Sequence, residues 1–110
     1  MLKNSTLIKE FEENFESLGE NIDPEPFLLG SSDIGNLSYK IPVVHPMVKT
    51  ADEGIALHTD EFLKFGKSDT AYRGMAAGMK SILMTSVRIL MDPDFLKRIK
   101  NDFKENTRGL

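Results

Sequence analysis

Apolar side chains recur at helical spacing near the N-terminus of this 110-residue chain. Four of them are three, four and three residues apart, which places them on one side of a helix: Ile8, Phe11, Phe15 and Leu18. The other side is acidic and is expected to face water: Glu10, Glu12, Glu13 and Glu16. Gly19 is a good C-terminal stop, so the pattern predicts a helix over about Ser5 to Leu18.

A longer helical pattern covers about Ser68 to Met91, with Ser68 or Asp69 suited to cap it. Most of its positions that follow the period are apolar: Tyr72, Met75, Ala76, Met79, Ile82, Leu83, Ser86 and Leu90. Further apolar residues lie on other sides of the helix: Met84, Val87 and Met91. We therefore expect cover over most of this helix, and we interpret its methionine-rich stripe as core rather than as a ligand groove.

A final helix is predicted after Asp92-Pro93, because an aspartate can cap it and proline suits its first position. Its apolar stripe is Phe95, Leu96, Ile99 and Phe103. Its basic residues are expected on a solvated face rather than in a binding patch: Lys97, Arg98, Lys100 and Lys104.

The middle of the chain has a different pattern. Pro24 and Pro26 oppose a helix, and Tyr39, Ile41 and Val43 alternate with polar residues or proline. This alternation predicts a strand over about 38–44, at a sheet edge or a bulge because Pro42 lacks an N–H donor. The apolar run at 55–57 predicts a second, short buried strand. The order helix, strand, strand, long helix, helix predicts an α/β or α+β architecture, of which α/β is preferred.

Composition narrows the class of protein. With 40% hydrophobic and 28% charged residues the chain resembles an ordinary soluble domain, and its net charge of -3 does not favour nucleic acid. No apolar run is long enough to span a membrane, and no signal-peptide pattern opens the chain. Cysteine is absent, which excludes disulfides and thiolate metal sites and favours a reducing cytoplasm.

Small polar residues gather at one bend of the chain, in Gly30, Ser31, Ser32, Asp33 and Asn36. Glycine permits close backbone approach, and hydroxyl and N–H groups could hold a carboxylate ligand. The alternative is a simple turn capped by an aspartate side chain. A phosphate-binding loop is not indicated, because the lysine and the following helix of that motif are missing.

The chain contains two histidines, His45 and His58. A self-contained zinc site needs about three or four converging ligands, so spacing alone favours a structural or surface role for His58. A histidine that ends a buried strand can nevertheless face a metal ion, with a nearby carboxylate orienting its ring. His45, between Val44 and Pro46, is more simply a histidine at a strand end.

Two motifs together resemble a known family. The stretches GSSDIGNLSYKIPVVHP and EGIALHTDEF, followed by a long helix rich in alanine and methionine, are similar to the C-terminal end of zinc-dependent amidohydrolases. These are the aminoacylase and carboxypeptidase-type metallopeptidases, including p-aminobenzoyl-glutamate hydrolases. The resemblance covers about residues 5–92, and residues 93–110 form the C-terminal helix.

The resemblance implies roles for individual residues. His58 would be the last metal ligand of the complete enzyme, and the small polar loop at 30–33 with Asn36 would line the substrate pocket. The role of His45 is open. The family's other metal ligands and its Glu-Glu pair have no counterpart here, since Glu12-Glu13 has no histidine partner.

Two interpretations follow from these sequence features. In the first, residues 1–110 form one partial catalytic domain of a metal-dependent amidohydrolase that cleaves an N-acyl amino acid or small peptide. It would be inactive alone and would need an N-terminal catalytic segment and a divalent metal such as zinc. In the second, the chain is a small noncatalytic module that binds a partner through its apolar long helix. In either case the uncovered helix predicts exposed apolar patches and self-association.

Overall fold

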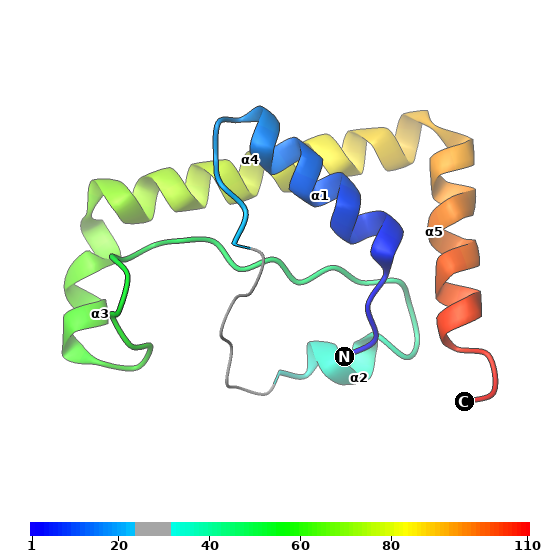
Figure 1. Cartoon of the computed structure of the whole chain (residues 1–110), viewed down its shortest axis with the longest axis horizontal. Coiled ribbons are helices and arrows are strands. Elements are labelled where there is room, and N and C mark those ends of the chain that lie inside the picture. The colour runs from blue at the N-terminus through cyan, green and yellow to red at the C-terminus, as the bar shows by residue number, and fades with distance from the viewer. Residues whose placement is uncertain (24–31) are drawn as a thin grey trace.

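The computed structural model describes residues 1–23 and 32–110, which contain helices but no strand. The elements are α1 (Ser5–Ser17), α2 (Ile34–Leu37), α3 (Asp60–Lys64), the 3-10 helix η1 (Phe65–Lys67), α4 (Asp69–Met91) and α5 (Pro93–Asn106). The long α4 runs along the molecule, α1 lies across its middle, and α5 turns away at its C-terminal end (Figure 1). Helix α3 lies at the other end, and an extended segment runs below α4 (Figure 1).

The three long helices begin and end where local sequence signals predicted. The side chains of Asn4, Ser68 and Asp92 each accept a hydrogen bond from a backbone N–H in the first turn of α1, α4 and α5. Pro93 occupies the start of α5, and Gly19 follows α1 with a positive φ of 81°. The three helix predictions are confirmed. They could be made from sequence because capping depends on residues that are close together in the chain.

The predicted α/β fold is wrong. Residues 34–37 form α2, residues 38–40 form a turn, and residues 42–50, here called the strap, are extended. The strap makes no backbone hydrogen bond to any other described residue. Its alternating side chains are half-buried and exposed in turn from Val44 to Thr50, because they pack on helices instead of within a sheet. The alternation that predicted the strand, at Tyr39, Ile41 and Val43, does not correspond to burial, because Tyr39 and Ile41 are 50% and 48% exposed and the extended strap begins only at residue 42.

The second predicted strand, at 55–57, is also absent. Gly54 has a φ of 84°, and the N–H of Ile55 bonds back to the carbonyl of Asp52 at 3.4 Å. These features make a turn. Leu57 is exposed rather than buried. A positive φ at glycine favours a turn over continued strand geometry, which explains the difference.

The buried core lies where α1 and α5 meet. Leu7, Phe95 and Ile99 form it, with Val44 of the strap and Ile89 of α4 packed against them. The strap is held close to α4 at two glycines. A β-carbon added at Gly74 would lie 2.0 Å from the carbonyl oxygen of Lys49, and one added at Gly78 would lie 3.1 Å from Val48 Cγ1. Only glycine at position 74 allows this approach.

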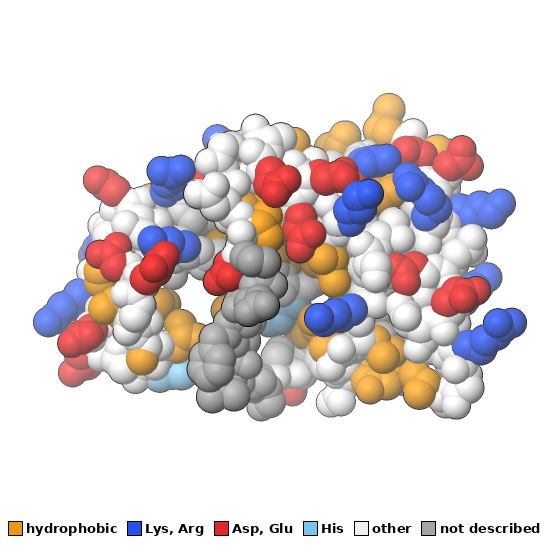
Figure 2. All heavy atoms as spheres, in the orientation of Figure 1, with side chains coloured by type: hydrophobic (Ala, Val, Ile, Leu, Met, Phe, Trp, Pro, Cys, Tyr) orange, Lys and Arg blue, Asp and Glu red, His pale blue; other side chains and the backbone are white. Residues whose placement is uncertain are grey.

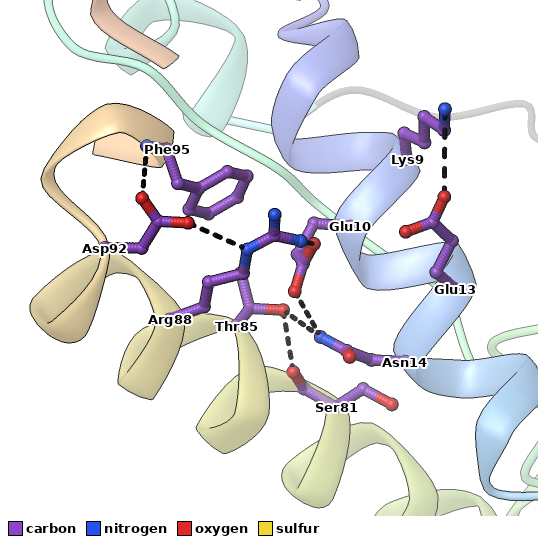
Figure 3. Close-up of polar contacts among 9 residues, drawn as sticks. All are labelled: Lys9, Glu10, Glu13, Asn14, Ser81, Thr85, Arg88, Asp92 and Phe95. Atoms are coloured by element: carbon purple, nitrogen blue, oxygen red, sulfur yellow. Dashed lines mark hydrogen bonds and ion pairs between the residues drawn. The ribbon is translucent and has the colours of Figure 1, made fainter. Parts of the chain in front are cut away.

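A polar network joins α1 to α4, and one of its members is buried although the sequence predicted that it faces water. Glu10 was expected on the solvated face of α1, but it is only 6% exposed and pairs with Arg88 of α4. Asn14 donates to Glu10 Oε1 at 3.2 Å and to Thr85 Oγ1 at 3.1 Å (Figure 3). The Arg88 guanidinium also lies over the Phe95 ring, 4.5 Å from its centroid. Glu10 is thus buried because a cation from another helix compensates its charge.

The apolar stripe of α4 is likewise not core within the described residues. The buried positions of this helix are instead its small residues, Gly74, Ala77, Gly78, Ser81 and Thr85. The basic residues of α5 are exposed as predicted: Lys97, Arg98, Lys100 and Lys104. None of the described helices is both long and apolar enough to cross a membrane.

Candidate functional site

The described part of the small polar loop leads directly into α2. Ser32, Asp33 and Asn36 are all exposed, and the Ser32 hydroxyl oxygen accepts the N–H of Ile34 at 3.3 Å. Asp33 precedes α2, but its carboxylate makes no capping hydrogen bond. The alternative of a turn capped by this aspartate is therefore not what the structure shows. Gly30 and Ser31, the other predicted members of the loop, lie outside the described residues.

Ser38 anchors this loop to the N-terminus. Its hydroxyl accepts the N–H of Leu2 at 2.8 Å and donates to the carbonyl of Gly35 at 2.6 Å. The side chain is 1% exposed, so both bonds are made away from water. The sequence pattern predicts only a strand at Ser38, because a bond to the distant Leu2 leaves no local signal.

His58 lies in the turn before α3, and its backbone is unusual. Its φ of 61° makes it the non-glycine residue with a positive φ in the described chain. Thr59 follows as the N-cap of α3, accepting the N–H of Phe62 at 3.2 Å and donating to the carbonyl of Ala56 at 2.7 Å. A left-handed residue is uncommon outside glycine and is found at functional sites as well as in turns. The imidazole is exposed.

The structure does not assemble a metal centre from these residues. Across the described residues, no group of three or more His, Asp or Glu side chains is placed to hold a metal ion. Asp60 and Glu61 share the first turn of α3 next to His58, and His45 lies exposed on the strap. Helices α2 and α3 lie well apart along the molecule (Figure 1). The loop and His58 are therefore two separate parts, not one completed pocket.

Two side chains with shifted pKa values, Asp92 and Arg73, lie outside this candidate site. The pKa of the Asp92 carboxyl is held below its ordinary value, chiefly by the hydrogen bond from the Phe95 N–H and further by Arg88, 3.6 Å away. The pKa of Arg73 is raised by its hydrogen bond and ion pair with Glu20, at 2.9 Å. Both shifts have structural causes at helix contacts, so neither marks a catalytic acid or base.

Comparison with known proteins relates the chain to enzymes that cleave peptide and amide bonds. Human Xaa-Arg dipeptidase is 30% identical over 108 residues, which cover 94% of this chain and 24% of that enzyme. The mouse Xaa-Arg dipeptidase is 27% identical over 108 residues. A p-aminobenzoyl-glutamate hydrolase subunit of Escherichia coli (strain K12) is 28% identical over 80 residues, covering 73% of this chain and 17% of that protein.

These similarities confirm the predicted resemblance to the C-terminal segment of amidohydrolases. The chain spans about a quarter of the length of the Xaa-Arg dipeptidases that it matches. No protein-family model matches the chain, and no solved structure matches it. The relationship to these enzymes is thus one of sequence over a limited segment.

Proposed function

We propose that this chain supplies the C-terminal part of the catalytic domain of a metal-dependent amidohydrolase. The reaction would be hydrolysis of an amide bond in an N-acyl amino acid or a small peptide. Water adds its oxygen to the acyl carbon, the C–N bond breaks, and the amine product takes up a proton. The 110 residues alone would have no turnover, since the rest of the site would come from the part of the enzyme that the chain does not span.

The similarity to two kinds of amide-cleaving enzyme carries this proposal. A dipeptidase and a p-aminobenzoyl-glutamate hydrolase both match, and the two dipeptidases match over 94% of the chain. A partner-binding module without catalysis gives no reason for both the small polar loop and the His58 motif to occur together. The hydrolase proposal accounts for both.

Within the proposed enzyme His58 would be a metal ligand. Its exposed imidazole extends from a left-handed turn that is fixed on one side by the Thr59 cap. The exposed Ser32, Asp33 and Asn36, with Gly30 and Ser31, would contact the substrate. Ser38 would act as a positioning residue, because its two buried hydrogen bonds hold the loop against the N-terminus.

The described residues do not by themselves fit a metal ion, because three convergent ligands are missing among them. A divalent metal such as zinc belongs to the proposal only through His58 together with ligands from the rest of the enzyme. When such an ion is bound, it can activate water and polarise an acyl oxygen.

A single-chain hybrid tests this function. The 110-residue chain replaces the matching segment of human Xaa-Arg dipeptidase, which is 24% of that enzyme, and hydrolysis of dipeptides with C-terminal arginine is measured with zinc supplied. We expect activity that His58→Ala lowers by at least about 100-fold, because loss of a ligand removes the metal. Zinc content, measured on the same samples, should fall in parallel.

Asp52→Asn is the matched control. Asp52 is exposed in the same turn-rich segment, outside the EGIALHTDEF motif, and should tolerate the change with activity within about twofold. The proposal is wrong if the hybrid folds and binds zinc but His58→Ala leaves both zinc content and activity unchanged. It is equally wrong if the purified 110-residue chain hydrolyses amides in the presence of zinc and retains that activity after His58→Ala.

A further inference from the structure

Helix α4 buries its small side chains and exposes its large apolar ones, which is the reverse of an ordinary surface helix. It buries glycine, alanine, serine and threonine against the strap and α1, whereas its large apolar side chains are exposed. We call six of these the outer face of α4, and they are 52–82% exposed: Tyr72, Met75, Met79, Ile82, Leu83 and Leu90. Exposed apolar side chains of α4 extend beyond these six, since Met84, Val87 and Met91 are 38–78% exposed, and hydrophobic side chains protrude along the upper edge of the molecule over the C-terminal half of α4 (Figure 2). A helix normally turns its largest apolar groups toward a core, so this face lacks its cover.

The outer face is continuous and carries no charge. At 3.6 residues per turn its six residues occupy an arc of roughly 100° along the helix, the width of a core-facing stripe. Ser86 is the other residue in that arc, and its hydroxyl is occupied by a bond to the carbonyl of Ile82 at 2.8 Å. The nearest cation on the same helix, Lys80, lies outside the arc. The uncharged arc therefore resembles the apolar centre of a protein interface more than a surface that faces solvent.

A hollow of about 380 Å³ lies beside the outer face, between α4 and the strap. Its walls are Pro46 and Val48 of the strap, Gly78, and four residues of the outer face. Because the strap lies close to Gly78, its residues Pro46 and Val48 form one side of this hollow. It could receive one or more apolar side chains from a docked partner.

The surface left uncovered is too large for a complete domain of this mass. The accessible surface is 8470 Å². A folded monomer of this mass exposes roughly 6,100 Å², so the excess is roughly 2,300 Å². The radius of gyration is 15.5 Å, compared with about 13 Å for a compact domain of this length. A standard interface covers only about 800 Å² per partner. The excess therefore fits a large body that completes the domain better than it fits a single contact with a second copy.

We infer that the outer face of α4 is the docking surface for the rest of the amidohydrolase, the part that corresponds to the other three quarters of the Xaa-Arg dipeptidases. This inference rests on the proposed function, which supplies the partner. The partner presents an uncharged apolar surface to Met79 and Leu83 and inserts a side chain into the hollow beside the strap. Docking converts the exposed stripe of α4 into the core that its sequence pattern predicts.

The test uses the full chain and a defined probe. The probe is the part of human Xaa-Arg dipeptidase outside the segment matched here, produced as a separate polypeptide. The chain is labelled at its N-terminal amine, since it has no cysteine, and binding is followed by anisotropy and sedimentation. We expect a 1:1 complex at tens of micromolar or below. Leu83→Asp should weaken it by at least about 100-fold, because a carboxylate would be buried without a partner.

Lys80→Ser is the matched control, because it changes the net charge by the same amount on the same helix but outside the outer face. It should bind like the original chain. Circular dichroism checks that Leu83→Asp keeps its helices, as expected for a side chain that is 56% exposed. Ile82→Lys, on the same face with the opposite charge, should also lose binding and so excludes a purely electrostatic effect.

The outcomes separate this inference from the proposed function. Absence of a complex overturns the inference, as does equal binding by Leu83→Asp, or a homodimer that the probe does not displace. If the single-chain hybrid is active while the separate parts fail to associate, the inference alone is wrong. A complex that depends on Leu83, formed without any hydrolysis in the complex or in the hybrid, supports the inference and counts against the function.

Discussion

Substitution of Gly74 by alanine tests the contact that holds the strap to α4. A β-carbon at this position would lie 2.0 Å from the carbonyl oxygen of Lys49 and 2.9 Å from its carbonyl carbon. Both atoms belong to the backbone, so no side chain can rotate away. An ordinary contact begins near 3.4 Å, and the strap and α4 must therefore separate by more than 1 Å locally.

The magnitude follows from two opposing effects. Overpacking of this kind costs about 3 kcal/mol at the upper end of its usual range, because the strap backbone must move. Alanine also favours the helix over glycine by about 1 kcal/mol. The net expectation is about 2 kcal/mol of lost stability. For 110 residues the entropy of unfolding near the midpoint is about 0.23 kcal/mol/K, so the melting temperature should fall by about 9 °C.

Thermal unfolding followed by circular dichroism at 222 nm measures this change. Gly35→Ala is the control, because Gly35 is also helical but has no atom within 4 Å of an added β-carbon. It should be neutral or stabilise the protein by up to about 1 kcal/mol. A Gly74→Ala protein that melts within 2 °C of the original would refute the close approach of the strap to α4.

Three further predictions concern the polar contacts between helices. Arg88→Leu should cost about 2 kcal/mol because it leaves the buried Glu10 unpaired, and the double variant with Glu10→Leu should recover most of this in urea unfolding. Asp92→Asn keeps the cap of α5 but removes a carboxylate whose pKa is lowered in the folded protein. The variant should therefore be less stable than the original chain at pH 7, and urea midpoints across pH should show this difference in stability disappearing as the pH falls below about 4. Asn4→Ala removes the cap of α1 and a buried bond to α5, and should cost about 2 kcal/mol by urea unfolding, whereas unchanged stability would contradict the described contact.

The helices could be predicted because their signals are local. The caps at Asn4, Ser68 and Asp92 each bond within three residues, and Pro93 fixes the start of α5 by its own geometry. Each of these signals joins residues that are close together in the chain. The same holds for Gly19, whose positive φ ends α1.

The strands could not be predicted correctly, because a strand depends on a partner elsewhere. The alternation at Tyr39, Ile41 and Val43 predicted a strand, but residues 38–40 form a turn, and the extended strap that follows has no described segment paired with it. Predictions of which residues are buried were wrong for the same reason. Glu10 is buried because Arg88 reaches it from a position 78 residues away, and Leu83 is exposed because no described residue covers it.

The candidate site was only partly accessible to sequence reasoning. The family motif identified His58 and the small polar loop, and their assignment stays a prediction. The positive φ of His58 and the anchoring of the loop by Ser38 carry no local sequence signature, since one is a backbone state and the other depends on Leu2. Such features of positioning emerge only in the folded chain.

Zinc binding should depend on the outer face of α4 as well as on the imidazole. In the proposed enzyme the other metal ligands lie on the partner, so His58 can join them only when the partner is docked on α4. Leu83→Asp should therefore weaken zinc binding in the mixture with the separate probe, although residue 83 cannot ligate a metal. His58→Ala should weaken zinc binding while association persists, and isothermal titration of each variant with zinc distinguishes the two. If Leu83→Asp lowers association but leaves zinc affinity unchanged, docking and the metal site are independent, and the proposal that His58 shares a metal ion with ligands of the partner is incorrect.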